Sequence, residues 1–414
     1  MYDLISIGKA AKQASFSLMN LKSELKSKAL CAIADELIKN TDDILKENEK
    51  DLEALLKNKE KASFYDRLKL TKERIEQMAE GVRQVDLLPD PVGEVTEMVK
   101  RPNGLIIGRK RVPLGVIGII YEARPNVTVD AAVLCLKTSN VCILRGGSEA
   151  INSNKILVKV MKKALKSVGI IDSAVSLVED TSREIAAEMM RLNDYIDVLI
   201  PRGGAGLIKT VVNTATVPVI ETGTGNCHIY VEESADINMA AEIIENAKTT
   251  RVSVCNACES LLIDEKIANK ALPIIYKKLK AHNVEVFGCK KTCEILKDAI
   301  LATDDDHKTE YLDYKISVKV VKDTDEAISH INNYSTKHSE SIITTNYEKA
   351  QRFLDEVDSA AVYINASTRF TDGYEFGFGA EIGISTQKLH ARGPLGLREL
   401  TTSKYIIYGN GQIR

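Results

Sequence analysis

The chain has 414 residues, of which 44% are hydrophobic and 28% are charged, a composition typical of a globular protein with more than one domain. Its 56 Lys and Arg residues nearly balance its 58 Asp and Glu residues, so the chain lacks the basic excess of nucleic-acid-binding and membrane-surface proteins. No apolar stretch reaches the ~18 residues that a membrane-spanning helix needs. We also find no secretory signal pattern, and eight cysteines are too dilute for a disulfide scaffold, so we expect a cytoplasmic protein with free thiols.

Residues 1–100 predict a charged, helical region. Apolar residues recur at three- and four-residue spacing over residues 22–39, which indicates an amphipathic helix. Thr41 and Thr71 each stand before a further helical pattern, where a threonine favours an N-cap.

From residue 104 onward, short β-branched strands alternate with helical patterns. Such alternation predicts parallel βαβ units whose sheet is covered by helices on both faces. The series restarts near residue 226, so we predict an α/β fold with two Rossmann-like parallel-sheet domains. The expected strands are 105–107, 115–121, 140–144, 174–178, 198–200, 218–220, 228–231, 259–263 and 314–321, and the expected helices are 129–137, 153–167, 182–192 and 235–248.

The C-terminal tail ends in a run of consecutive apolar and aromatic residues, 405–408, after a long loop at 388–400. This pattern suits a strand that is buried on both faces. Because an unpaired strand of this kind would promote aggregation, we expect strand 403–408 to pair with a partner subunit and not with its own chain.

Two glycine-rich turns are candidates for binding phosphate groups. The first, residues 200–206, contains Gly203 and Gly204 between a strand and a helix, where backbone amides can meet a ligand's phosphates. The second, residues 222–228, precedes a strand and contains Gly223. Neither is a complete phosphate-binding fingerprint, so a turn of purely geometric function remains the alternative.

The cysteines allow three interpretations. Cys255 and Cys258 form a CxxC pair, which with Cys289 and Cys293 would suggest a zinc site or, alone, a redox dithiol. However, Cys258 leads directly into an apolar strand, which suits neither arrangement. We therefore favour the third interpretation, in which Cys255 is a single nucleophile on an irregular segment after a helix.

Three motifs upstream of Cys255 resemble the aldehyde dehydrogenase superfamily. They are Arg124-Pro-Asn126, Leu144-Arg-Gly-Gly147 and Glu221-Thr-Gly-Thr-Gly225, and each follows a predicted strand. The spacing between these motifs and the cysteine is also similar to that of the superfamily. Longer motifs narrow the resemblance to the γ-glutamyl phosphate reductase family, the glutamate-5-semialdehyde dehydrogenases of proline biosynthesis. These motifs are residues 121–128, 137–140, 225–231, 376–386 and 388–396, and the resemblance covers nearly the whole chain.

The resemblance implies that NADPH reduces L-glutamyl 5-phosphate to glutamate 5-semialdehyde through a thioester on Cys255. Asn126 is then expected to stabilise the oxyanion, and Arg124 and Arg392 to bind the substrate's phosphate and α-carboxylate unless they form structural ion pairs. In hydrolytic relatives a glutamate at this place activates water, but hydrolysis would waste the thioester of a reductase. Glu221 is therefore expected to contact the cofactor, to be held away from the thioester or to be structural, with a direct catalytic role as the alternative. The expected cofactor contacts are Arg145, Gly146, Gly203, Gly204, Glu221 and Gly223, and no metal is expected.

By the same resemblance, the NADP-binding domain spans residues 1–225, the catalytic domain 226–362, and a return segment with an oligomerisation tail 363–414. A homodimer or tetramer is expected, with a transient contact to the glutamate 5-kinase that supplies the substrate. Three alternatives stay open at this point: a hydrolytic aldehyde dehydrogenase, a CoA-acylating relative, and a catalytically inactive scaffold.

Overall fold

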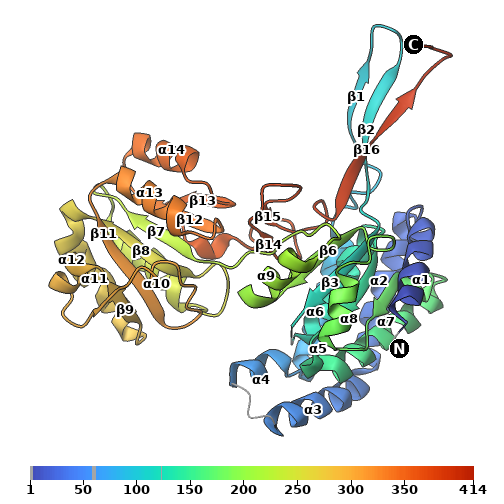
Figure 1. Cartoon of the computed structure of the whole chain (residues 1–414), viewed down its shortest axis with the longest axis horizontal. Helices are drawn as coiled ribbons and strands as arrows, with labels where there is room; N and C mark the ends of the chain where they lie inside the picture. The colour runs from blue at the N-terminus through green and yellow to red at the C-terminus, as the bar shows by residue number, and fades with distance from the viewer. Residues whose placement is uncertain (1–2, 58–61, 123) are drawn as a thin grey trace. The chain divides into compact units, whose positions relative to one another are not determined.

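The computed structural model describes residues 3–57, 62–122 and 124–414. The chain forms two compact units (Figure 1). Unit 1 contains the residues up to Glu221 together with Gly377–Gly383 and Leu395–Arg414, and unit 2 contains Thr222–Phe376 and Ile384–Pro394. The predicted domain boundaries at 225 and 362 were drawn from the resemblance and stay a prediction.

Unit 1 begins with helices, as the charged amphipathic pattern predicted. They are α1 (Leu4–Leu18), α2 (Ser23–Lys39), α3 (Thr41–Lys57), α4 (Ala62–Leu68) and α5 (Lys72–Leu87). The buried face of α2 packs against α5 and α7. Thr71 caps α5 as expected, since its side chain accepts a hydrogen bond from Arg74 N. The expected cap at Thr41 was wrong: only Asn40 separates α2 from α3, and the Thr41 hydroxyl donates back to Ile38 O at 2.8 Å.

The core of unit 1 is a four-stranded parallel sheet with the order β5-β4-β3-β6. Its strands are β3 (Val116–Tyr121), β4 (Val141–Arg145), β5 (Val175–Leu177) and β6 (Val198–Arg202). Every residue of β3 is buried, as expected for a sheet with helices on both faces. The strand expected at 218–220 is reduced to one bridge between Val219 and Leu199. The helices that follow β3, β4, β5 and β6 are α6 (Pro125–Lys137), α7 (Ile151–Ser167), α8 (Arg183–Met189) and α9 (Ala205–Thr214).

Unit 2 contains a seven-stranded sheet with the order β10-β9-β11-β8-β7-β12-β13, in which every described pair is parallel. Alternate residues of β7 face opposite layers: Ile229 and Val231 pack with α10 and α11, and Tyr230 packs with α13 and α14. The two parallel sheets confirm the predicted fold class. The strands are β7 (Cys227–Val231), β8 (Cys258–Asp264), β9 (Glu285–Gly288), β10 (Ile300–Leu301), β11 (Lys315–Val321), β12 (Ser339–Ile343) and β13 (Ala361–Ile364), and the helices are α10 (Ile237–Thr249), α11 (Glu265–Ala281), α12 (Lys290–Ile295), α13 (Thr324–Tyr334) and α14 (Tyr347–Glu356).

Short elements complete both units. In unit 2, β14 (Ile384–Ser385) pairs antiparallel with β15 (Gly393–Pro394). Three 3-10 turns are η1 (Ser148–Ala150), η2 (Asp172–Ala174) and η3 (Thr368–Phe370). No helix within the described ranges is long and apolar enough to cross a membrane.

A three-stranded antiparallel arm belongs to unit 1 and has the order β1-β2-β16. Its strands are β1 (Val95–Lys100), β2 (Ile106–Pro113) and β16 (Thr401–Tyr408). The expectation that the terminal strand avoids its own chain was wrong, because β16 pairs with β2 along its whole length, from Thr401 opposite Pro113 to Tyr408 opposite Ile106.

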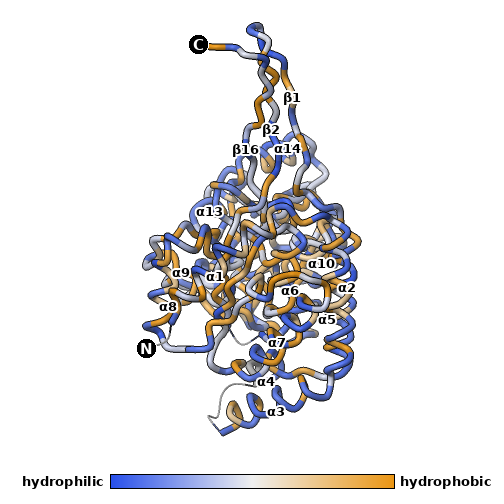
Figure 2. Tube along the Cα trace, turned by 90° about the vertical axis from the view of Figure 1, so that its right-hand side faces the viewer, coloured by the Kyte–Doolittle hydropathy of each residue, from blue (hydrophilic) through white to orange (hydrophobic). Residues whose placement is uncertain are grey.

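The terminal strand is largely exposed within this chain, so its expected burial on both faces stays a prediction that concerns a partner subunit. Tyr405 is 69% exposed and Ile407 is 60% exposed. The arm consists of its three strands and the turns between them (Figure 1). Figure 2 shows hydrophobic residues along the arm. The run of apolar residues therefore marks an exposed surface and not a core strand.

Candidate active site

Cys255 lies on an irregular segment between α10 and β8, as the sequence predicted. The helix before it is capped by Asp236, which accepts hydrogen bonds from Asn238 N and Met239 N. The residue after the segment, Cys258, begins a fully buried strand. The segment therefore runs from the end of a capped helix into a buried strand, and the Cys255 side chain is only partly buried.

The backbone of Cys255 is packed against the glycine-rich turn that precedes β7. A Cβ atom on Gly225 would lie 1.4 Å from the Cys255 carbonyl oxygen, so only glycine fits at this position. The Cys227 thiol donates a hydrogen bond to the same carbonyl at 3.1 Å. On its other side, Gly225 N donates to the Glu310 carboxylate at 2.6 Å. Two segments of unit 2 thus hold the cysteine backbone in place.

Asn256, the neighbour of Cys255, ties the cysteine segment to the turn that contains η3. Its side-chain amide donates to the carbonyl oxygens of Arg369 (3.2 Å) and Thr371 (3.1 Å). In return, the Thr368 hydroxyl donates to Asn256 O at 2.8 Å. One buried residue therefore fixes the position of Arg369 relative to the cysteine.

A positively charged side chain, Arg369, interacts with Cys255. Burial lowers the pKa of Arg369, the nearby Arg251 lowers it further, and the charge of Cys255 raises it. Since that interaction is mutual, the guanidinium stabilises the negative form of the cysteine, which is the nucleophilic form. Sequence reasoning missed Arg369, because it lies more than a hundred residues after the cysteine.

Cys258 is in a different environment. It is fully buried in the core of unit 2 and donates to Ser260 O at 3.4 Å. Burial raises the pKa of its thiol to about 12. A thiol with such a pKa stays protonated at neutral pH, which supports the division into a reactive Cys255 and a structural Cys258.

The remaining candidate cysteines have local partners. Cys289 Sγ accepts a hydrogen bond from Val320 N at 3.3 Å, and Cys293 Sγ donates to Gly288 O at 3.4 Å. No group of three or more potential metal ligands occurs among the residues that the structure describes.

In unit 1, Arg145 ends β4 and reaches the loop after β5. Its guanidinium donates to the carbonyl oxygens of Thr181 (2.5 Å) and Ser182 (3.2 Å). The next residue, Gly146, has no room for a Cβ atom, which would lie 2.2 Å from Asn154 Nδ2. Both Arg145 Nε and Asn154 Nδ2 are buried without a hydrogen-bond partner among the described residues.

The predicted phosphate turn at Gly203 and Gly204 lies against the side chain of Glu122. A Cβ atom on Gly203 would lie 2.6 Å from the Glu122 carboxyl carbon. Gly204 N donates to the same carboxylate at 3.2 Å. The Gly204 amide thus faces an anion supplied by the chain itself. Gly223 lies in unit 2, where its N–H donates to Ile384 O at 2.7 Å.

The predicted substrate residues fall into both units. Asn126 lies in the first turn of α6 and donates to Asp130 at 3.0 Å, and burial raises the pKa of Asp130 to about 6. Arg124 is the residue before that helix, and Glu221 ends the main segment of unit 1. Arg392 pairs with Asp358 at 2.8 Å, so the alternative of a structural ion pair describes it in this structure.

Comparisons with known proteins agree with this geometry. The model of the aldehyde dehydrogenase family matches residues 3–291 and 316–405. The chain belongs to the aldehyde dehydrogenase family. The γ-glutamyl phosphate reductases of Clostridium perfringens strain 13 and Caldicellulosiruptor bescii are 64% and 62% identical to the chain, over 100% of its length and 99% and 100% of theirs. The crystal structure of γ-glutamyl phosphate reductase from Thermotoga maritima matches with a TM-score of 0.98 and 53% identity over 100% of both chains.

These matches confirm the resemblance to the γ-glutamyl phosphate reductases. Members of the aldehyde dehydrogenase family use a nicotinamide cofactor and act on small molecules. An anionic cofactor needs positive charge and unoccupied hydrogen-bond donors, and Arg145 Nε and Asn154 Nδ2 are such donors.

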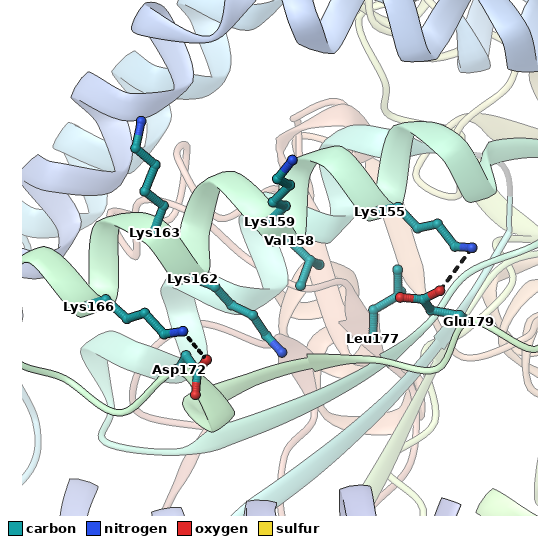
Figure 3. A pocket seen from close by; sticks show the side chains of 9 residues that line it. All are labelled: Lys155, Val158, Lys159, Lys162, Lys163, Lys166, Asp172, Leu177 and Glu179. Atoms are coloured by element: carbon teal, nitrogen blue, oxygen red, sulfur yellow. Dashed lines mark ion pairs between the residues drawn. The ribbon is translucent and has the colours of Figure 1, made fainter. Parts of the chain in front are cut away.

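A second feature of unit 1 that fits an anion is a pocket of about 500 Å³ beside α7, here called the lysine groove (Figure 3). Val158 and Leu177, both buried, form its apolar part. Two lysines are paired with acids of the groove: Lys155 with Glu179 at 2.9 Å and Lys166 with Asp172 at 2.8 Å. A third lysine, Lys163, pairs with Glu36 outside the groove at 2.6 Å. The complete lining is Lys155, Val158, Lys159, Lys162, Lys163, Lys166, Asp172, Leu177 and Glu179.

Proposed function

We propose that the protein reduces L-glutamyl 5-phosphate to L-glutamate 5-semialdehyde with release of phosphate, the second step of proline biosynthesis. The observation that carries this proposal is the partly exposed Cys255 on a backbone packed against Gly225 and tied down through Asn256, in a chain 64% identical to a γ-glutamyl phosphate reductase.

The proposed chemistry begins with attack of the Cys255 thiolate on the acyl carbonyl carbon. A C–S bond forms, the C–O bond to phosphate breaks, and the electron pair leaves with the phosphate. The backbone N–H of Cys255 and the side-chain amide of Asn126 are the proposed donors to the oxyanion of the tetrahedral intermediate. Because phosphate is a good leaving group, the step needs no general acid.

NADPH, when bound, would supply the hydride that reduces the acyl carbon to the aldehyde level. The C–S bond then breaks, its electron pair returns to Cys255 as the thiolate, and the aldehyde is released. We assign its pyrophosphate and ribose to Arg145 and Gly146, with Gly203, Gly204, Glu221 and Gly223 as further proposed contacts. The preference for NADPH over NADH is assigned to the lysine groove, since a 2′-phosphate adds charge that several lysines can bind.

We propose that the arm of β1, β2 and β16 is the oligomerisation element of a homodimer or tetramer. β16 is an edge strand of the arm, and its exposed Tyr405 and Ile407 would be covered by a second subunit. A cytoplasmic location and a transient contact with glutamate 5-kinase complete the proposal.

One assay tests the function. Glutamate 5-semialdehyde and NADP are mixed with the protein, with and without inorganic phosphate, and NADPH absorbance is followed. We expect sustained turnover only with phosphate. Turnover without phosphate would indicate a hydrolytic aldehyde dehydrogenase, a requirement for coenzyme A would indicate the CoA-acylating alternative, and absence of turnover under all conditions would indicate an inactive scaffold.

A further inference from the structure

The turn around η3 presents an arginine to the nucleophile for which the reaction as proposed so far has no use. Arg369 is partly buried, and its Nε is fully buried without a hydrogen-bond partner among the described residues. A buried guanidinium N–H that lacks an acceptor costs free energy unless a ligand provides one. This nitrogen therefore indicates a ligand with acceptor oxygens.

The position of Arg369 is fixed by contacts within unit 2. Asn256 holds the carbonyl oxygens of Arg369 and Thr371, and Thr368 binds back to Asn256. Behind them, the Thr371 hydroxyl lies 2.6 Å from the Ser339 hydroxyl and 2.7 Å from that of Tyr363. A turn held by this many buried bonds presents its arginine at a fixed place beside the cysteine.

The charges near Arg369 leave room for an anion. Arg251, four residues before Cys255, adds a second positive charge that lowers the pKa of Arg369, while Cys255, Asp372 and Cys227 raise it. By contrast, Arg392, which the sequence predicted to bind substrate, pairs with Asp358, and Lys337 and Lys388 pair with the same carboxylate. Arg369 is thus better placed than Arg392 to bind an anionic group of the substrate.

We propose that Arg369, with Arg251, binds the phosphate group of the acyl phosphate and stabilises it as it leaves; this assignment rests on the proposed function. The phosphate is bonded to the carbonyl carbon that Cys255 attacks, whereas the α-carboxylate lies at the far end of the glutamyl chain. A guanidinium beside the cysteine therefore meets the phosphate first. The negative charge of the phosphate grows as the C–O bond breaks. A planar guanidinium can bind two oxygens of the phosphate at once.

The first test compares two alkylating reagents on Cys255, each followed by peptide mass spectrometry. Iodoacetate is an anion and iodoacetamide is neutral, so the ratio of their rates reports an anion site beside the thiol independently of thiol reactivity. In Arg369→Gln we expect the rate with iodoacetate divided by the rate with iodoacetamide to fall about tenfold. Inorganic phosphate should protect Cys255 from iodoacetate in the parent protein and not in the variant. Arg352→Gln is the matched control, since Arg352 pairs with Asp325 and Glu356 on the exposed face of α14.

The second test uses the semialdehyde assay, in which phosphate is a substrate. The KM for phosphate should rise at least about tenfold in Arg369→Gln, while the KM for NADP changes less than about twofold. Arg369→Lys keeps the charge and loses the two-pronged geometry, so its KM for phosphate should lie between those of the parent protein and Arg369→Gln. If Arg369→Gln does not fold, Arg369→Lys replaces it. An unchanged reagent ratio together with an unchanged KM for phosphate would overturn the assignment. A lowered ratio in a protein with no phosphate-dependent turnover would keep the anion site and refute the proposed function.

Discussion

The cysteine segment of unit 2 and the lysine groove of unit 1 are built in opposite ways. Cys255 is held through its backbone by Gly225, Cys227 and Asn256, which are buried or closely packed. The groove consists of long side chains on one face of α7, where Lys155, for example, is 45% exposed. The first arrangement gives one residue a precise position, and the second gives a region a charge.

The difference follows from the chemistry that each region is proposed to serve. Bond formation at a carbonyl carbon requires a nucleophile placed within a fraction of an ångström, and packed backbone supplies that precision. Several lysines can attract a phosphate even when their side chains move, because electrostatic attraction acts over several ångströms. Single substitutions in the cysteine segment should therefore lower activity strongly. Single substitutions in the lysine groove should each have a small effect on cofactor binding, and these effects should add up.

The largest effect is expected at the cysteine pair. Cys255→Ala should lose activity by at least about 10³-fold because the nucleophile is gone. Cys258→Ala should keep most of the activity and lose about 1 kcal/mol of stability, since it removes only a buried thiol from the core. Semialdehyde oxidation and chemical denaturation measure the two effects, and equal inactivation of both variants would restore the dithiol interpretation.

The next effect tests the backbone contact itself. Gly225→Ala would place a methyl group on the Cys255 carbonyl oxygen, so the segment must shift. We expect activity to fall about 10²-fold, because an error of one ångström at the nucleophile is enough. Gly206→Ala, where a Cβ atom meets nothing within 4 Å, is the control and should be active. A fully active Gly225→Ala would show that the packing does not position the nucleophile.

A smaller effect is expected in the lysine groove. Lys159→Ala and Lys162→Ala together should raise the KM for NADPH by about three- to tenfold and leave the KM for NADH nearly unchanged. Added salt should shrink the difference between parent and variant. Lys270→Ala and Lys277→Ala together, both on the exposed side of α11, are the charge-matched control. Equal increases in the KM values for NADPH and NADH would show that the 2′-phosphate does not bind in the lysine groove.

The smallest effect concerns a cluster of histidines in unit 2, in which the ring of His330 contacts those of His228 and His307. Burial lowers the pKa of His330 to about 2, helped by the charges of His228, Lys319 and His307 and opposed by Asp304. The folded protein therefore keeps this imidazole neutral, while the unfolded chain takes up a proton below pH 6.5. Folding stability should fall by about 1.4 kcal/mol for each pH unit below that value, and His330→Phe should remove this loss. Denaturation at pH 7.5 and 5.5 measures it, and identical pH slopes would contradict it.

Local patterns in the sequence predicted much of this structure and failed where distant segments meet. β3 to β8 and β11 follow from β-branched runs, whereas β9, β10, β12 and β13 of unit 2 were not predicted. The placement of Cys255 follows from the strand that begins at Cys258. Arg369 could not be found this way, because its link to Asn256 joins residues 113 positions apart. The terminal strand misled for a related reason: consecutive apolar residues indicate burial, but they do not say whether the same chain provides it.

The most direct test of the account is the acyl-enzyme on Cys255. The parent protein is mixed with glutamate 5-semialdehyde and NADP in the absence of phosphate, and NADPH formation and the mass of the Cys255 peptide are measured together. The account predicts a burst of one NADPH per active site, then no further turnover, with a glutamyl adduct on Cys255 that added phosphate removes. Continued turnover without phosphate, or an adduct on another residue, would contradict it.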